Sequence, residues 1–302
     1  MKKIILSVSR RGIQLTVIFF LIVLPLNSLE VSIRSQVGSD IGNFDSNCLS
    51  RLYHSAVENG WISEEKLAGI KGSLWSLDIK GYRISEPLAV VEAFASAVKL
   101  PAIFLFSAIP FLLLTLLMGR VFCSWLCPAN LIFEIVQMLR VFFERIGVKF
   151  KKITFSYDLK YYLLAFGIVF SFFAGVPFFS VFYPPLLLSN EVFLYVYSLP
   201  VTGLTIILGI IIFEFFISPR SWCRYFCPGG ALYSFLGKYR LIGVSADKNL
   251  CTQKEGCTVC LDSCGMGFYP PAKNHVGECD NCGKCIIDCP KDALNFKRKF
   301  RQ

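Results

Sequence analysis

Residues 279–290 read CDNCGKCIIDCP, which places Cys279, Cys282, Cys285 and Cys289 in the spacing C-x2-C-x2-C-x3-C-P. In bacterial chains with this spacing, three of the thiolates hold one [4Fe–4S] cluster and the fourth ligates a second cluster. The shape of the cluster explains the spacing, because a short loop reaches three corners of a cube and a distant cysteine closes the fourth. This stretch therefore predicts a fold built around inorganic clusters.

A second cysteine run lies directly upstream. It follows C-x5-C-x2-C-x3-C, the same pattern with a wider first gap. Exchanging the fourth ligand of each run gives two complete sets of four thiolates. The predicted first cluster uses Cys251, Cys257, Cys260 and Cys289. The predicted second cluster uses Cys279, Cys282, Cys285 and Cys264.

Zinc and disulfides are the alternatives for eight cysteines within 39 residues. Paired C-x2-C sequences occur in zinc sites, but three cysteines at intervals of two residues suit one tetrahedral zinc ion poorly. Disulfides are typical of small secreted domains, whereas this segment follows a strongly apolar chain. We therefore predict that residues 245–302 form a small α+β domain of the bacterial 2[4Fe–4S] ferredoxin type.

The rest of the chain has the composition of a membrane protein. Of its 302 residues 54% are hydrophobic, and the mean hydropathy is +0.56. Four apolar stretches of 17 to 23 residues are long enough, or nearly so, for a hydrocarbon core of about 30 Å. We therefore predict an all-α membrane domain over residues 1–244, with four transmembrane helices at about 13–29, 100–118, 161–183 and 201–217.

Basic residues predict the topology of these spans. Residues 1–12 hold four basic residues and no acid, residues 119–160 hold seven against three acids, and thirteen follow the fourth span. The connection over 184–200 has none, and the loop over 30–99 has seven basic residues against nine acids. By the positive-inside rule both termini and the ferredoxin domain are cytoplasmic, and residues 30–99 form an external loop. Because the net charge of +10 is concentrated in these loops, it does not indicate a nucleic-acid partner.

A second cysteine motif occurs twice. Residues 120–128 read RVFCSWLCP and residues 220–228 read RSWCRYFCP, both of the form R-x2-C-x3-C-P. Each follows an apolar stretch and precedes an amphipathic segment. This pattern predicts an internal repeat of a two-span hairpin, a cysteine motif and a surface helix. A pseudo-twofold axis along the membrane normal would bring together Cys123, Cys127, Cys223 and Cys227.

These four thiols have three candidate roles and one purely structural alternative. They could hold a third iron–sulfur centre, bind a soft metal such as Cu(I), or cycle between dithiol and disulfide. Alternatively they are small packing residues of shared ancestry. Pro128 and Pro228 suit the first position of a helix. Cys127 and Cys227 would then lie at helix N-termini, where the dipole favours a thiolate.

The two R-x2-C-x3-C-P motifs, four spans and a dicluster segment resemble the NapH/MauN family of membrane-bound polyferredoxins. Arg10, Arg11 and Gln14 before the first span, and ISEPL at residues 84–88, extend the resemblance over nearly the whole chain. It implies a bacterial inner-membrane protein that passes electrons from the quinol pool toward a periplasmic reductase of the nitrate reductase type. Its partners would be other electron-transfer subunits, such as a periplasmic-facing ferredoxin or cytochrome. Other related membrane ferredoxins are implicated in copper handling, so a metallocentre-assembly or copper-reducing role without quinol chemistry stays open.

Quinol oxidation requires a proton acceptor near the ring. Glu214, within or at the end of the fourth span, is the first candidate, because a carboxylate is costly to place in lipid. It could equally reach the interface without a catalytic role. His54, Glu86 and Glu92 are alternatives on the outer side. The isolated pair Cys48 and His54 is more typical of structural residues than of a metal site.

Overall fold

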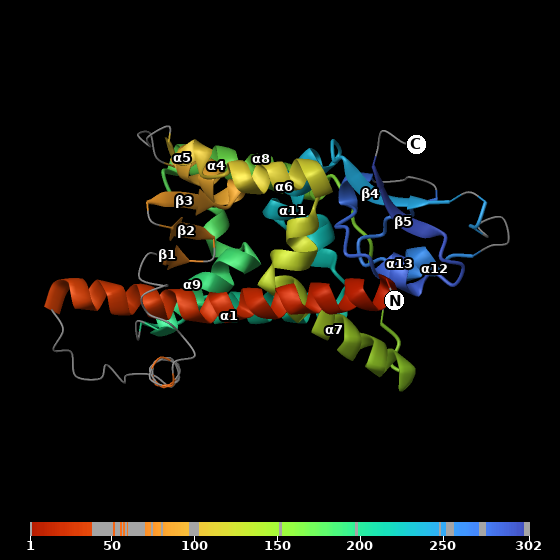
Figure 1. The fold of residues 1–302 in the computed structure, drawn as a ribbon, viewed down its shortest axis with the longest axis horizontal. Helices are drawn as coiled ribbons and strands as arrows, with labels where there is room; N and C mark the ends of the chain where they lie inside the picture. Colours follow the sequence, from red (N-terminus) through yellow and green to blue (C-terminus); the bar gives the residue numbers. More distant parts are fainter. Residues whose placement is uncertain are drawn as a thin grey trace.

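The computed structural model describes residues 2–37, 51, 55, 57, 59, 70–73, 75–79, 81–96, 103–150, 153–196, 199–247, 249–251, 257–271 and 276–298. The pair Cys48 and His54 lies outside these residues. Helix α1 (Lys2–Val37) extends along the longest dimension of the molecule (Figure 1). An antiparallel sheet of β1 (Ile70–Ser73), β2 (Ser76–Ile79) and β3 (Tyr82–Ser85) lies toward one end of α1. The cysteine-rich C-terminal segment lies at the other end.

Two similar series of helices fill the space between the two ends. Each contains a five-residue π-helix over its cysteine motif, and the two π-helices are 100 residues apart. The first series is α4 (Pro87–Ser96), α5 (Ile103–Phe106), α6 (Ile109–Met118), η1 (Phe122–Leu126) and α7 (Pro128–Arg145). The second is α8 (Leu159–Ala174), η2 (Phe179–Val181), α9 (Pro184–Val196), α10 (Leu204–Phe216), η3 (Trp222–Phe226) and α11 (Pro228–Gly237). Pro128 and Pro228 each begin a helix, as their fixed φ and missing N–H favour.

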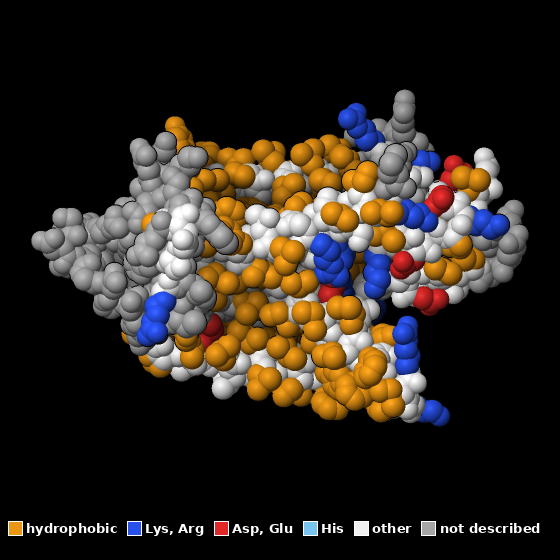
Figure 2. All heavy atoms as spheres, turned by 60° about the horizontal axis from the view of Figure 1, so that its bottom comes forward, with side chains coloured by type: hydrophobic (Ala, Val, Ile, Leu, Met, Phe, Trp, Pro, Cys, Tyr) orange, Lys and Arg blue, Asp and Glu red, His pale blue; other side chains and the backbone are white. Residues whose placement is uncertain are grey.

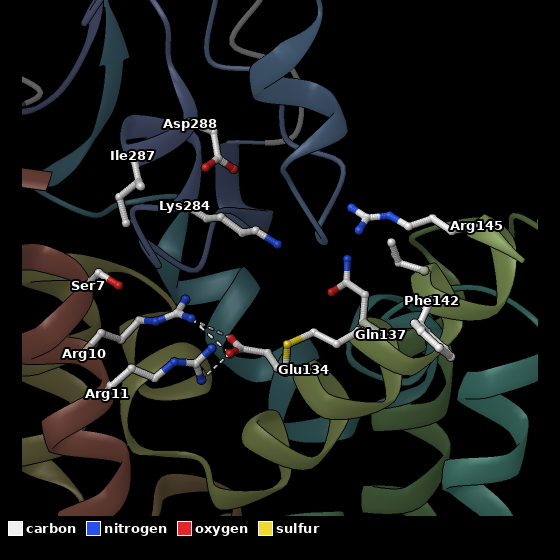
Figure 3. Close-up of a pocket in the computed structure, with 12 residues that line it drawn as sticks. Ser7, Arg10, Arg11, Glu134, Gln137, Phe142, Arg145, Lys284, Ile287 and Asp288 are labelled. Atoms are coloured by element: carbon white, nitrogen blue, oxygen red, sulfur yellow. Dashed lines mark hydrogen bonds and ion pairs between the residues drawn. The ribbon is translucent and has the colours of Figure 1, made fainter. Parts of the chain in front are cut away.

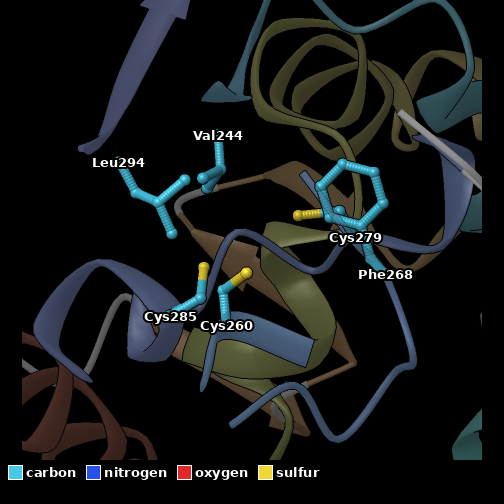
Figure 4. Close-up of a cluster of buried hydrophobic side chains, with 6 residues drawn as sticks. All are labelled: Val244, Cys260, Phe268, Cys279, Cys285 and Leu294. Carbon is cyan, nitrogen blue, oxygen red and sulfur yellow. The ribbon is translucent and has the colours of Figure 1, made fainter. Parts of the chain in front are cut away.

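The C-terminal segment is a small α+β unit. Strands β4 (Ile242–Ala246) and β5 (Leu294–Arg298) pair antiparallel, with Val244 opposite Phe296. Between them in the chain lie the short helices α12 (Val259–Asp262), η5 (Val276–Glu278) and α13 (Lys284–Asp288). The unit has its own core, which contains three of the cysteines (Figure 4).

The apolar stretches predicted as spans form shorter helices than expected. Within the described residues, only Lys3–Ser28 of α1 is long and apolar enough to cross a bilayer by itself. The second stretch is interrupted at Ser107 and Ala108, and the third ends at Ala174. Gly175 ends it as a left-handed cap with φ 65°, the conformation that glycine favours.

Two segments predicted to lie outside the bundle are packed within it. Residues 184–200 were expected as an outer connection, but Pro184–Val196 forms α9, which packs against α1, α7 and α10. Trp75, from the predicted external loop, is buried, and its indole N–H donates to the carbonyl of Pro185 over 2.8 Å. Its ring contacts Phe122 edge-on, with centroids 5.3 Å apart. The loop therefore reaches inward to the first cysteine motif, because its apolar residues are buried there.

A broad apolar surface covers the bundle (Figure 2). Charged side chains gather mainly over the C-terminal unit at one end of this view. Helix α8 exposes Phe166, Phe172 and Phe173, and α7 exposes Met138 and Phe142. A surface of this extent on a soluble monomer would be unusual.

Candidate redox site

The four ligands predicted for the first cluster surround one small cavity. Cys251, Cys257 and Cys260 come from the upstream run, and Cys289 comes from the downstream run. Leu294 forms part of the apolar wall. Helices α12 and α13 pack against each other and so bring the two runs together. Cluster binding by this set stays a prediction.

The second predicted set forms part of the core of the C-terminal unit. Cys279 and Cys285 are buried in this core (Figure 4). Cys264 packs against the same core. Burial raises the pKa of Cys279 to about 11. Burial also raises the pKa of Cys285, and the neighbouring thiols of Cys279 and Cys264 raise it further. Burial and the neighbouring carboxylate of Asp280 also raise the pKa of Cys282. A metal centre bound by this set would hold these residues as thiolates, because a metal ion stabilises the deprotonated form; cluster binding here stays a prediction.

The spacing of these thiols bears on the choice between a cluster and a single ion. In the described part of the chain, no three Cys, His, Asp or Glu side chains lie close enough to bind one metal ion. Around a single zinc with Zn–S bonds of about 2.3 Å, the sulfurs would lie roughly 3.8 Å apart. The irons of a cubane hold their thiolates farther apart. The choice of a four-iron cluster over zinc stays a prediction from the cysteine spacing in the sequence.

Two acidic residues on either side of Cys279 join the C-terminal unit to the two R-x2-C-x3-C-P motifs. Arg120 of the first motif donates from Nη1 to Oε2 of Glu278 over 2.7 Å. Arg220 of the second motif donates from Nη1 to Oδ2 of Asp280 over 3.1 Å. All four side chains are at most 7% exposed. A ligand of the second predicted cluster is therefore held between the two halves of the repeat.

Further hydrogen bonds hold the backbone around Cys279. Arg240 donates to the Cys279 carbonyl over 3.0 Å, and the Ser124 hydroxyl donates to the Asp280 carbonyl over 2.6 Å. Lys160 also donates to the Glu278 carboxylate. Sequence reasoning missed this anchor. Its only signal was a pair of acidic residues flanking the first cysteine of a cluster motif.

The second motif arginine has a strained backbone. Arg220 has φ 56°, in the left-handed region that a non-glycine residue seldom adopts. This conformation accompanies contacts with two carboxylates, since Arg220 Nη2 also donates to Glu134 Oε1 over 2.8 Å. Glu134 is shared with Arg10 and Arg11 of α1, at 3.0 and 2.6 Å. One network of buried charges therefore links the N-terminal helix, the second motif and the C-terminal unit.

The four motif thiols lie near one another within the bundle. Cys127 packs in one apolar cluster with Cys223 and Trp222, and Trp222 also contacts the cluster that contains Cys227. The thiols of Cys123 and Cys227 are close enough for each to influence the pKa of the buried Cys127. The grouping that the repeat predicts is therefore present in the fold. Whether it holds iron, copper or a disulfide stays a prediction.

Two buried donors at this group have no acceptor within the described chain: Arg120 Nε and Trp222 Nε1. Leaving such a donor unpaired in a protein interior costs about 1–3 kcal/mol. Sulfide or thiolate sulfur of a metal centre would accept hydrogen bonds from them. The residues present therefore fit an anionic sulfur-rich centre.

The sequence-based expectation for the acidity of the motif thiols requires a correction. Cys127 and Cys227 are the N-caps of α7 and α11, as predicted, and the Gly230 N–H donates to Cys227 Sγ over 3.3 Å. This contact favours the thiolate. Burial has the larger, opposite effect and raises the pKa of both thiols. Without a metal, these cysteines are therefore neutral thiols at neutral pH.

The carboxylate of Glu214 caps the second π-helix. Its side chain is buried, and its oxygens accept from the backbone N–H groups of Ser221 at 3.1 Å and Trp222 at 2.5 Å. This position orients the segment that carries Cys223. Its proposed part in quinol chemistry stays a prediction.

Glu86 lies closer to the motif cysteines than its predicted place in an external loop implied. It is 1% exposed, and its carboxylate accepts from Tyr233 over 2.8 Å and from Tyr183 over 3.4 Å. Burial raises the pKa of Glu86 to about 7. Glu92 also points inward and accepts from the backbone of Phe179. Both carboxylates therefore belong to the bundle.

Comparisons with known proteins identify relatives of this chain. A family described as "4Fe-4S binding domain" matches residues 100–147 and 199–245, and each segment contains one R-x2-C-x3-C-P motif. An uncharacterized protein of Methanocaldococcus jannaschii is 31% identical over 196 residues, covering 63% of this chain and 76% of the relative.

Two named relatives are also similar. The ferredoxin-type protein NapH of Escherichia coli is 27% identical and covers 72% of this chain and 76% of the relative. The methylamine utilization ferredoxin-type protein MauN of Methylorubrum extorquens is 28% identical. The match covers 70% of this chain and 69% of the relative. No solved structure is significantly similar to the chain.

Proposed function

The chain belongs to the family of NapH/MauN ferredoxin-type proteins, and we propose that it is a membrane-bound carrier of electrons between quinol and a partner protein. The observation that carries this proposal is the anchor at Cys279. Arg120 and Arg220, from the two cysteine motifs, hold the acids on both sides of this predicted ligand. This anchor, which joins residues next to Cys279 to the two motif arginines, supports electron transfer between the second predicted ligand set and the motif thiols.

Two sets of residues in the C-terminal unit would hold the clusters. The first is Cys251, Cys257, Cys260 and Cys289, and the second is Cys279, Cys282, Cys285 and Cys264. A [4Fe–4S] cluster accepts and donates single electrons at a potential set by nearby charges and hydrogen bonds. Around Cys279 the three cations Arg120, Arg220 and Lys160 exceed the two acids Glu278 and Asp280, and this balance would favour the more negative, reduced form of the second centre.

The motif thiols Cys123, Cys127, Cys223 and Cys227 would form a third redox site, deeper in the bundle than the C-terminal unit. The unpaired N–H groups of Arg120 and Trp222 support an iron–sulfur centre there. A centre held by these four residues would supply one-electron chemistry within the bundle.

Several features support a membrane location. Lys3 of α1 donates to the Cys289 carbonyl over 2.8 Å, so the N-terminus and the C-terminal unit lie at the same end of the molecule. The basic residues of the sequence belong mainly to this end, which supports a cytoplasmic position. Exposed phenylalanines on α8 would face lipid. The short helices α6, α8 and α10 would cross the bilayer together with α1, each connected through segments buried in the bundle.

Quinol reduction of the clusters tests this proposal. In anaerobically purified protein, a reduced quinol analogue is expected to produce the electron paramagnetic resonance signal of reduced clusters. Glu214→Gln is expected to slow this reduction if its carboxylate accepts a quinol proton. Glu144→Gln, which changes a partly exposed carboxylate on α7, is the matched control. Absence of reduction in the wild-type protein would contradict the proposal.

A copper-reducing or metallocentre-assembly role is the second candidate. Four clustered thiols with soft sulfur ligands favour Cu(I). This role predicts tight Cu(I) binding that disappears in Cys123→Ser and in Cys223→Ser. Iron retained at the motif thiols, with no competition from Cu(I), would contradict it.

A further inference from the structure

A cavity of about 510 Å³ opens between α1, α7 and α13. Figure 3 shows Lys284 from α13 and Arg145 from α7 extending toward its centre from opposite sides, with Gln137 between them. Arg10 and Arg11 from α1 approach Glu134 at the inner wall. The cavity is thus formed by three elements that are far apart in the sequence.

The charges around this cavity favour an anion. Its lining contains four basic side chains, those of Arg10, Arg11, Arg145 and Lys284, against the two acids Glu134 and Asp288. Glu134 already neutralises part of the charge of three arginines, since Arg220 also contacts it. Arg145 and Lys284 have no ion pair or hydrogen bond with the chain as described. The cavity therefore presents two cations to a ligand from outside, with Asp288 on the same helix as Lys284.

One side of the cavity is apolar and continues onto the molecular surface. Met138, Val141 and Phe142 line it, and all three are exposed on α7. Leu139 on α7 and Ile146, the residue that follows its last turn, are also exposed and lie beyond the cavity lining. A ligand that matches both parts must join an anionic group to hydrocarbon.

We propose that this cavity binds the headgroup phosphate of an anionic phospholipid of the inner leaflet, with Arg145 and Lys284 as its contacts and the acyl chains along α7. Basic pockets between helices at the cytoplasmic face are typical sites for such headgroups. The inference rests on the proposed membrane location, which places α7 at that interface. The lipid would link α1, α7 and α13 and hold the C-terminal unit on the membrane domain.

Lipid binding can be measured on the full-length protein in a neutral detergent by native mass spectrometry. The titrants are phosphatidylglycerol and phosphatidylcholine with the same acyl chains. The test variants are Arg145→Gln, at the end of α7, and the double variant Arg145→Gln/Lys284→Gln. The matched control is Lys297→Gln/Arg298→Gln, which removes two exposed charges from β5 outside the cavity.

We expect phosphatidylglycerol to bind more tightly than phosphatidylcholine, and the double variant to lose about 30-fold in affinity. This figure follows from a factor of about five for each basic residue. The single variant should lose about fivefold, and the control should bind as the wild type. Iron content, checked in every variant, identifies any loss that comes from damage to the clusters.

Equal binding of the two lipids, or equal affinity of the double variant and its control, would overturn the lipid site. Competition by inorganic phosphate or by an acidic peptide at the same concentration as the lipid would also overturn it, because the acyl chains would then contribute nothing. A wild-type chain recovered in the soluble fraction would instead contradict the proposed membrane location. Loss of quinol-dependent reduction with lipid binding intact would contradict the electron-transfer proposal alone.

Discussion

Arg120 and Glu278 are 158 residues apart in the chain, yet Nη1 of the arginine lies 2.7 Å from Oε2 of the glutamate. The arginine side chain is fully buried, and the glutamate side chain is 7% exposed. Lys160 contacts the same carboxylate oxygen. Two buried cations therefore depend on one acid, which itself precedes a predicted cluster ligand.

Glu278→Gln should destabilise the protein by about 3–5 kcal/mol, because it leaves the charges of Arg120 and Lys160 buried without their partner. Thermal unfolding in detergent measures this loss. Asp262→Asn, an exposed change on α12 in the same unit, is the control and should have little effect. Equal stability of Glu278→Gln and the wild type would show that the contact does not anchor the unit.

Cys264→Ser and Cys289→Ser should affect different clusters. The exchange of fourth ligands predicts that Cys289→Ser disturbs the cluster of the upstream run, although Cys289 belongs to the downstream run. Cys264→Ser should disturb the downstream cluster. Paramagnetic resonance of each variant should lose a different one of two signals. If each variant instead loses the signal of its own run, the exchanged assignment is wrong.

Trp222→Phe should lower the reduction potential of a centre held by the motif thiols. The indole Nε1–H is buried without an acceptor in the described chain, and a hydrogen bond to sulfur stabilises the reduced, more negative state. Potentiometric titration should show a decrease of roughly 60 mV, equivalent to a tenfold change for one electron. The two C-terminal clusters, unchanged in the same titration, are the internal control. An unchanged potential would contradict the assigned donor.

Glu86 should make stability fall as the pH rises. Its pKa is raised by burial to about 7 in the folded protein from an ordinary value near 4.5. The folded chain therefore holds a proton that the unfolded chain releases, so the stabilisation is complete below about pH 4.5 and is lost progressively up to about pH 7. A shift of this size corresponds to about 3 kcal/mol.

Glu86→Gln should remove this pH dependence and keep a neutral partner for Tyr233 and Tyr183. The measurement is thermal unfolding of the wild type and the variant between pH 5 and pH 8. The difference between their stabilities is compared at each pH. The variant should gain stability relative to the wild type toward pH 8. A constant difference across this range would mean that Glu86 does not titrate there.

The cysteine spacing predicts the grouping of the ligands, because the shape of a cluster restricts which thiols can share it. The internal repeat can also be predicted from the sequence, because R-x2-C-x3-C-P occurs twice at a separation of 100 residues. The predicted spans are longer than the helices that form, because hydropathy extends through turns. Gly175 and Pro177 mark the end of α8 within a stretch that is otherwise apolar.

The contacts between the two domains could not be predicted from the sequence. Nothing local to Glu278 or Asp280 indicates that an arginine from each half of the repeat will contact it. The inward position of Trp75 and Glu86 was missed because the loop around them has a balanced charge. Their partners, Pro185 and Tyr233, lie more than 100 residues away. Such pairs are determined by tertiary packing.

The central claim is that the C-terminal cysteines fold around iron and sulfide. Iron and acid-labile sulfide, measured with paramagnetic resonance on anaerobically purified protein, test it most directly. We predict roughly eight irons per chain for two clusters, and about ten to twelve if the motif thiols hold a third centre. A preparation with about two zinc ions per chain and no reducible signal would contradict the account.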